Sequence, residues 1–139
     1  MTFPRILREE ADDSTGYIGK WHMGFDDTRR PGFDHWVSFR GQGQFIDPVA
    51  NVNGRRVQTD GCLTDLITQW GLEFLDRDFD RPFCLKLSHE AVHRPFIPAK
   101  RHEDPYRDVA VEAPVNDPAA LPGKRALTRL LPESSGPHC

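Results

Sequence analysis

A long amphipathic segment lies between two short apolar runs and limits the folds open to this chain. Its apolar side chains recur at i, i+3, i+4, i+7 and i+11, which places them on one face of a helix. They are Leu63, Leu66, Ile67, Trp70 and Phe74. We expect this helix over residues 59–77, with Asp60 and Asp65 toward its positive end and Arg77 toward its negative end. Pro82 lies beyond its expected end and prevents the helix from continuing.

The apolar runs on either side of this helix are expected to be strands. The first covers residues 14–21, with Tyr17 and Ile18 at its centre, and the second covers residues 83–87 and suits a buried strand. Two strands joined by a long crossover that contains a helix form a βαβ unit, whose strands are parallel. The sequence therefore predicts an α/β fold with a parallel βαβ core and long loops.

The remaining segments are short or rich in turn residues. Residues 2–11 are expected to form a short helix, with Thr2 as its N-cap and Pro4 in its first turn. Residues 24–57 are rich in Gly, Pro, Asn and Asp and predict a long ordered excursion with at most short strands. We expect one domain over residues 1–106, followed by a Pro-rich, poorly ordered tail over residues 107–139.

Composition and charge exclude several classes of function. The net charge is −3 and the basic residues are mixed with acidic ones, so nucleic acid is not an expected partner. The longest apolar run is only a few residues, which excludes a transmembrane helix, and the first residues lack the apolar stretch of a signal peptide. The localisation is therefore unknown. Cys62, Cys84 and Cys139 are too far apart for a CxxC zinc site or a disulfide framework, and we expect Cys84 in the core.

A lysine and a histidine lie at the end of the first predicted strand, in the run Gly19-Lys20-Trp21-His22-Met23-Gly24. Residues two apart on a strand point to the same side, so we expect Lys20 and His22 to lie together. In a parallel α/β sheet the ligand crevice lies beyond the carboxyl ends of the strands. A fixed positive charge and a histidine there suit an anionic oxygen. On spacing alone, an ordinary surface Lys and His at a strand end is the simpler interpretation.

A second group of polar residues, His89-Glu90-Ala91-Val92-His93, follows the second predicted strand. It matches the HExxH signature of zinc peptidases, which requires a helix so that both histidines face one metal ion. Pro95 and Pro98 leave no room for such a helix, so we interpret the match as accidental. The two groups fall at the ends of parallel strands and are expected to converge on one crevice that suits a sulfate or phosphate ester.

Several stretches of the chain resemble the sulfatases of the alkaline phosphatase superfamily. They are residues 15–24, 30–36, 61–66, 81–83 and 87–96. The first looks like the second sulfatase signature, and the last is similar to the family pattern LSHxAVHxPF. The resemblance runs in order from Thr2 to about Tyr106, about three quarters of the chain. It identifies residues 1–106 as a partial sulfatase catalytic domain with a partial alkaline phosphatase-like fold.

The resemblance implies a role for three residues. Lys20 would bind a sulfate oxygen and offset charge in the transition state, and His22 would lie beside it near the nucleophile. His93 would contact the sulfate and protonate the leaving alcohol. The implied substrate is a sulfate ester, either a small molecule or a sulfated glycan. His89 and Arg94 match less fixed family positions, and Trp21 and Trp36 are expected to pack rather than to stack on a sugar.

The chain departs from the family at the cofactors. Sulfatases use calcium and a formylglycine made from Cys or Ser in a C/S-x-P-x-R motif, and no such motif occurs in this chain. Asp12-Asp13 and Asn116-Asp117 do not match the family's calcium ligands, so no metal ligand is assigned. The expectation is therefore an internal sulfatase fragment, inactive by itself, whose parent enzyme hydrolyses sulfate esters.

Three alternatives to a sulfatase fragment remain open. The first is a phosphate or phosphonate monoester hydrolase of the same superfamily, because the Lys-Trp-His signature serves both anions. The second is a non-catalytic remnant that binds an anion or a glycan without turnover. The third and most remote is a zinc peptidase acting through His89 and His93, which stoichiometric tight zinc binding would favour.

Overall fold

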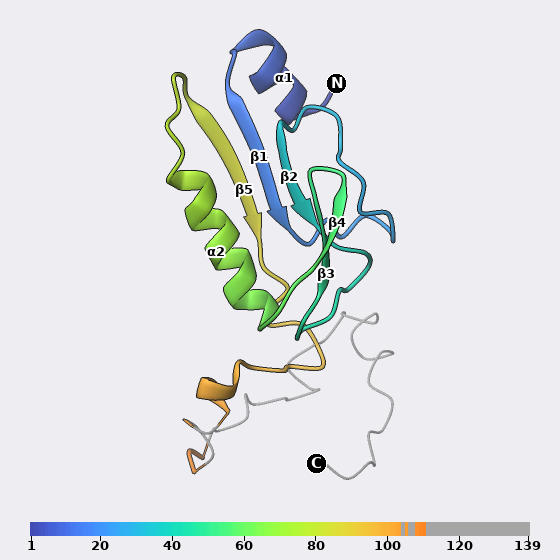
Figure 1. Cartoon of the computed structure of the whole chain (residues 1–139), viewed down its shortest axis with the longest axis vertical. Coiled ribbons are helices and arrows are strands. Elements are labelled where there is room, and N and C mark those ends of the chain that lie inside the picture. The colour runs from blue at the N-terminus through green and yellow to red at the C-terminus, as the bar shows by residue number, and fades with distance from the viewer. Residues whose placement is uncertain (104, 106–107, 111–139) are drawn as a thin grey trace, which may run out of the picture. The chain divides into compact units, whose positions relative to one another are not determined.

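The computed structural model describes residues 1–103, 105 and 108–110 (Figure 1). Residues Met1–Pro105 form one compact unit. Almost all of the expected tail over residues 107–139 lies outside the described residues. The elements are α1 (Phe3–Glu10), β1 (Ser14–Gly19), β2 (His35–Ser38), β3 (Val49–Val52), β4 (Arg55–Gln58), α2 (Leu63–Leu75), β5 (Phe83–Ser88) and a 3-10 turn at Lys100–His102. Within this described part, no helix is long and apolar enough to cross a membrane.

The described strands form one sheet in the order β4-β3-β2-β1-β5. Strands β1 and β5 are parallel neighbours, with Gly16 opposite Leu85 and Gly19 opposite Ser88, so the predicted βαβ unit is confirmed. Strand β2 is also parallel to β1. The arrowheads of these three strands point to the same end of the molecule in Figure 1. The hairpin β3–β4 is antiparallel and makes the sheet mixed, within the excursion that was expected to hold only short strands.

Helix α2 packs on one face of the sheet and carries the main core. It begins at Leu63 rather than at residue 59, because Gly61 has a φ of +107° and Cys62 is extended. The residues of this helix that are buried are Leu63, Ile67, Gly71 and Phe74. They pack with Ile18, Val37, Phe39 and Ala50 of the sheet and its loops. The apolar face predicted from the sequence is therefore the face that α2 buries.

The opposite face of the sheet holds an aromatic cluster. Tyr17 stacks on Trp36 with ring centroids 4.8 Å apart, and Phe33 and Trp21 pack against both. Phe3 of α1 meets Phe33 edge-on at 6.4 Å. Trp21 and Trp36 pack as the sequence analysis expected, and Tyr17 joins this cluster to the first strand.

Three expectations about the strands were wrong in detail. Strand β5 is an edge strand rather than a buried one, and Phe83 and Leu87 remain 43% and 42% exposed. Cys84 is consequently half-buried. The first strand ends at Gly19 and not at Trp21. Gly19 has a φ of +116°, and a Cβ there would lie 1.9 Å from the Ser88 carbonyl oxygen, so only glycine fits this strand end.

Candidate functional site

The segments that follow β1 and β5 lie side by side at the carboxyl end of the sheet. The register that pairs Gly19 with Ser88 continues into a hydrogen bond, because the Lys20 amide donates to the Ser88 carbonyl oxygen at 2.9 Å. The Tyr17 hydroxyl donates to the carbonyl oxygen of Lys20 from the aromatic face. Burial raises the pKa of Tyr17, which keeps this donor protonated. The backbone of Lys20 is therefore fixed from both sides.

The Lys20 side chain is buried and ion-paired. It is 9% exposed, and its Nζ lies 2.8 Å from Oε2 and 3.0 Å from Oε1 of Glu90, which is 4% exposed. Gln42, on the excursion before β3, accepts a second hydrogen bond from Nζ through its Oε1. An ammonium has three donors, so Glu90 and Gln42 leave one for a ligand.

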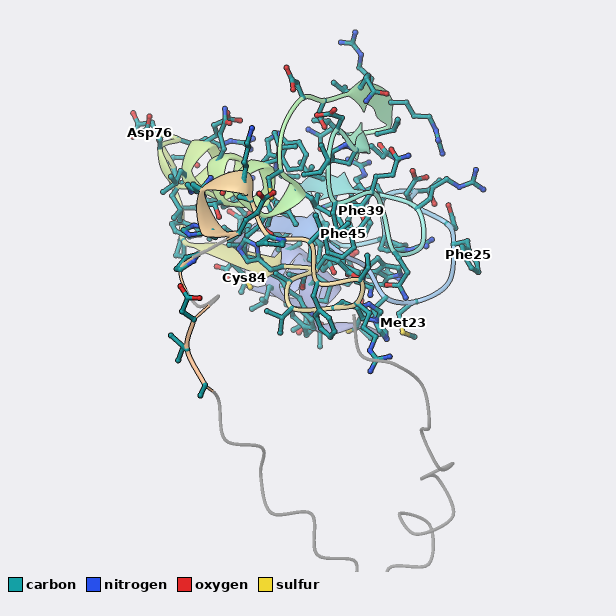
Figure 2. The ribbon with its side chains drawn as sticks, turned by 90° about the horizontal axis from the view of Figure 1, so that it is seen from below. Met23, Phe25, Phe39, Phe45, Asp76 and Cys84 are labelled. Atoms are coloured by element: carbon teal, nitrogen blue, oxygen red, sulfur yellow. The ribbon has the colours of Figure 1, made fainter. Side chains whose placement is uncertain are left out.

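His22 lies beside Lys20, but the reason differs from the one expected. Strand alternation cannot bring them together, because β1 has ended and His22 has a left-handed backbone with a φ of +59°. The turn places both residues in one pocket of about 200 Å³, together with Gln42. His22 itself is exposed. Phe25 of the same loop is 78% exposed and points outward in Figure 2.

His93 joins this group through Glu90. Its Nδ1 lies 2.8 Å from the carbonyl oxygen of Arg94 and 3.6 Å from Oε1 of Glu90. Both neighbours are acceptors, so the geometry requires the hydrogen to be on Nδ1. Nε2 is then the nitrogen that can contact a ligand. The structure thus places Lys20, His22 and His93 beyond the ends of β1 and β5. His93 lines a separate pocket from the one that Lys20 and His22 share, and Glu90 links the two.

The HExxH segment does not have the geometry of a zinc peptidase. Residues 89–93 form turn and irregular backbone rather than a helix. The Glu90 carboxylate is ion-paired with Lys20, whereas the glutamate of a zinc peptidase lies beside the metal ion as the general base. Among the described residues, no group of three or more His, Cys, Asp or Glu side chains could hold a metal ion. The described donor set therefore does not fit calcium either.

Sequence reasoning missed the contribution of Glu90 and Gln42 to this site. Glu90 enters the sequence-based interpretation only through the HExxH match, although it lies just beyond a strand expected to run parallel to the strand that ends near Lys20. The parallel pairing was a usable signal, because residues just beyond neighbouring strand ends lie close together. Gln42 had no local signal, since its approach to Lys20 depends on the path of a long loop.

Comparison with known proteins gives a family match over most of the chain. The Sulfatase family model matches residues 1–119, which extends beyond Tyr106, where the resemblance in the sequence was seen to end. N-acetylglucosamine-6-O-sulfatase of Bacteroides thetaiotaomicron is 36% identical over 120 residues, which cover 84% of this chain and 21% of that protein. N-acetylglucosamine-6-sulfatase of Capra hircus is 24% identical over 121 residues, which cover 78% of this chain and 22% of that protein.

A solved structure gives a similar result in three dimensions. It holds a protein in complex with its substrate D-glucosamine-2-N,6-O-disulfate, and it superposes with a TM-score of 0.76 at 36% sequence identity. The superposition covers 84% of this chain and 24% of that chain. The chain thus spans about a fifth of the length of the curated relatives it matches.

Proposed function

Because the chain belongs to the sulfatase family, we propose that Lys20, His22 and His93 form the sulfate-ester-binding part of a sulfuric ester hydrolase site. The observation that carries the proposal is the convergence of these side chains beyond the parallel strands β1 and β5. Lys20 and His22 share one pocket, and Lys20 and His93 both contact Glu90. A cation and two imidazoles beyond the same strand ends suit an anionic oxygen and a proton transfer.

The proposed substrate class is a sulfate ester of an amino sugar. The relative with 36% identity is named for N-acetylglucosamine 6-O-sulfate chemistry, and the solved neighbour holds D-glucosamine-2-N,6-O-disulfate. This chain covers only part of each, so the substrate is inferred from these names together with the crevice. Sulfated glycans are the corresponding larger partners.

Lys20 acts as the fixed positive charge of the proposed site. Its backbone is held by Tyr17 and Ser88, and its Nζ is held by Glu90 and Gln42. The remaining N–H donor binds a sulfate oxygen without further ordering of the side chain. A preorganised donor of this kind stabilises negative charge that develops in the transition state.

The two histidines near the Lys20 ammonium have different roles. His22 donates a hydrogen bond from the pocket that it shares with Lys20. His93 keeps Nδ1–H on the Arg94 carbonyl, so a proton bound at Nε2 can pass to the leaving alcohol oxygen. Glu90 Oε1 lies 3.6 Å from Nδ1, on the side of the ring away from Nε2.

The described residues do not fit the cofactors that the family uses. No described cluster offers a calcium site. Cys62 is followed by Leu63-Thr64 and Cys84 by Leu85-Lys86, so neither lies in a C/S-x-P-x-R motif. We therefore assign recognition of the sulfate group and proton transfer to this chain's residues, and no step through calcium or formylglycine.

Calorimetric titration with glucosamine 6-sulfate tests the proposal. His22 and His93 are exposed, so their replacement by alanine should leave the fold intact. We expect His22→Ala and His93→Ala each to weaken binding about tenfold, the size of one charge-assisted hydrogen bond. His89→Ala is the matched control, since His89 is exposed in the same loop and has no assigned role. Equal binding of unsulfated glucosamine, or equal losses in all three variants, would contradict the proposal.

A further inference from the structure

We propose that Glu90 is a specificity-determining residue that makes this site prefer a singly charged sulfate ester to a doubly charged phosphate ester. The inference rests on the proposed function, because it concerns the anion that Lys20 and His93 bind. The Glu90 carboxylate is buried, and under the proposed function its main task is to hold the Lys20 ammonium in place. The inference gives this carboxylate a second role.

The geometry places a full negative charge next to the anion position. Both carboxylate oxygens of Glu90 lie within 3.0 Å of Lys20 Nζ, at 2.8 and 3.0 Å. An ester oxygen that binds the remaining Nζ donor lies within a few ångströms of the same carboxylate, because both contact one nitrogen atom. Glu90 is 4% exposed, so water screens this charge only weakly.

Glu90 cancels the positive charge of Lys20 at the anion position. The ion pair that they form has no net charge. His93 lines a separate pocket together with Asp65 and Arg101, which form their own ion pair at 2.6 Å. The attraction for an anion therefore comes from hydrogen-bond donors more than from net positive charge.

The Glu90 charge beside these hydrogen-bond donors discriminates between sulfate esters and phosphate esters. A sulfate monoester carries one negative charge, and a phosphate monoester carries close to two above its second pKa of about 6. Repulsion from the Glu90 carboxylate scales with the charge of the ligand, so it penalises phosphate twice as strongly. Without Glu90, the same donors would bind the more highly charged ester more tightly.

Two substitutions distinguish the effect of the Glu90 charge from the effect of its contact with Lys20. Glu90→Gln keeps the shape and an oxygen acceptor for Lys20 but removes the charge. Gln42→Glu adds a negative charge at the other partner of Lys20 Nζ, at an exposed position where the fold tolerates it. The two variants should move the preference in opposite directions. Glu9→Gln is the control, because Glu9 forms an exposed pair with Arg5 away from the site.

The experiment measures dissociation constants for methyl sulfate and methyl phosphate at pH 8 and low ionic strength, by NMR titration of each folded variant. We expect Glu90→Gln to shift the affinity ratio about tenfold toward methyl phosphate, as loss of one nearby unit charge implies. Gln42→Glu should shift the ratio toward methyl sulfate, and Glu9→Gln should leave it unchanged. If Glu90→Gln does not fold, the ratio of methyl sulfate to methyl phosphate affinity in Gln42→Glu tests the inference by itself.

The failures of the two proposals are distinguishable. If wild type binds the esters but the ratio is the same in all variants, or moves the other way, Glu90 is a support only and the inference is overturned. If neither ester binds wild type or any variant, the proposed function fails and the inference fails with it.

Discussion

At the residue scale, Lys20 and Glu90 make each other's burial possible. A buried ammonium or carboxylate is costly unless an opposite charge and hydrogen bonds compensate for the lost water. Glu90 supplies the charge, and Gln42 supplies a further acceptor from the excursion. Lys20, Glu90 and Gln42 therefore connect three segments that are distant in sequence, and the proposed anion site depends on these contacts.

A double-mutant cycle on this pair tests that dependence. Lys20→Met leaves Glu90 buried without its cation and should lower the free energy of unfolding by about 3–5 kcal/mol. Glu90→Gln introduced into the same chain removes the uncompensated charge and should restore most of that loss. Urea unfolding of the wild type, both single variants and the double variant gives the interaction free energy between the two side chains. Additive losses would show that the two side chains do not depend on each other.

A second buried residue makes stability depend on pH. Burial and the Arg77 guanidinium lower the pKa of His35 to about 4. Its Nδ1 accepts hydrogen bonds from Asn53 at 3.2 Å and from Arg77 at 3.0 Å, which requires the neutral ring. In the unfolded chain the imidazole binds a proton below about 6.5. The unfolded state therefore takes up the proton first, and stability is lost as the pH falls from about 6.5 to about 4.

This dependence can be measured by urea unfolding across that window. We expect the free energy of unfolding to rise by about 3 kcal/mol between pH 4 and pH 6.5 because of His35 alone. His35→Asn retains an acceptor for Arg77 but does not titrate, so its slope over this window should be smaller by that amount. Identical slopes in the two proteins would rule out His35 as the cause.

Residue types at the strand ends were predictable, but their contacts were not. The motif around Lys20 and His22 was identified from the sequence, and both residues line one pocket as expected. The argument from strand alternation was wrong, because the left-handed turn at His22 depends on where Gly19 ends the strand. The role of Glu90 needed the register between two strands separated by a long crossover.

At the element scale, Phe74 anchors the C-terminal end of helix α2 on the sheet. Phe74 is fully buried, and its ring fills the space above Gly16 of β1, where a Cβ would lie 2.6 Å from the ring. It also contacts Phe79 and Phe83, with ring centroids 5.1 and 5.7 Å away. This contact joins the helix to both strands of the βαβ unit.

Removal of this side chain should therefore be costly. We expect Phe74→Ala to lower the free energy of unfolding by about 3–5 kcal/mol, the usual range for a large buried aromatic residue. Leu72→Ala, on the exposed side of the same helix, should change it by less than about 0.5 kcal/mol. Thermal or urea unfolding of both variants measures the difference. Similar small losses in both would mean that α2 is not anchored at Phe74.

The elements differ in how well the sequence predicted them. The periodic pattern of α2 identified its buried face, and the apolar runs identified β1 and β5, because these signals are local. The exposure of β5 was not predictable from its apolar composition. It follows from the position of β5 at the edge of the described sheet, which is a property of the topology.

At the scale of the whole molecule, two of the described hollows compete as the ligand site. One is the crevice beyond β1 and β5 with Lys20, His22 and His93. The other is a more apolar groove of about 460 Å³ beside α1, lined by residues that include Phe3, Trp21 and Phe33. The groove is the larger of the two, and its lining also includes the cations Arg5, Arg30 and Lys86. A binding map therefore has to separate the two sites.

The most direct test is an amide NMR map of the isotope-labelled chain titrated with glucosamine 6-sulfate. The account predicts saturable shifts confined to residues 20–24, 42 and 88–94, with no comparable shifts from unsulfated glucosamine. Shifts centred on the groove beside α1, or no difference between the sulfated and unsulfated sugar, would contradict the assignment of the sulfate-ester site to Lys20, His22 and His93.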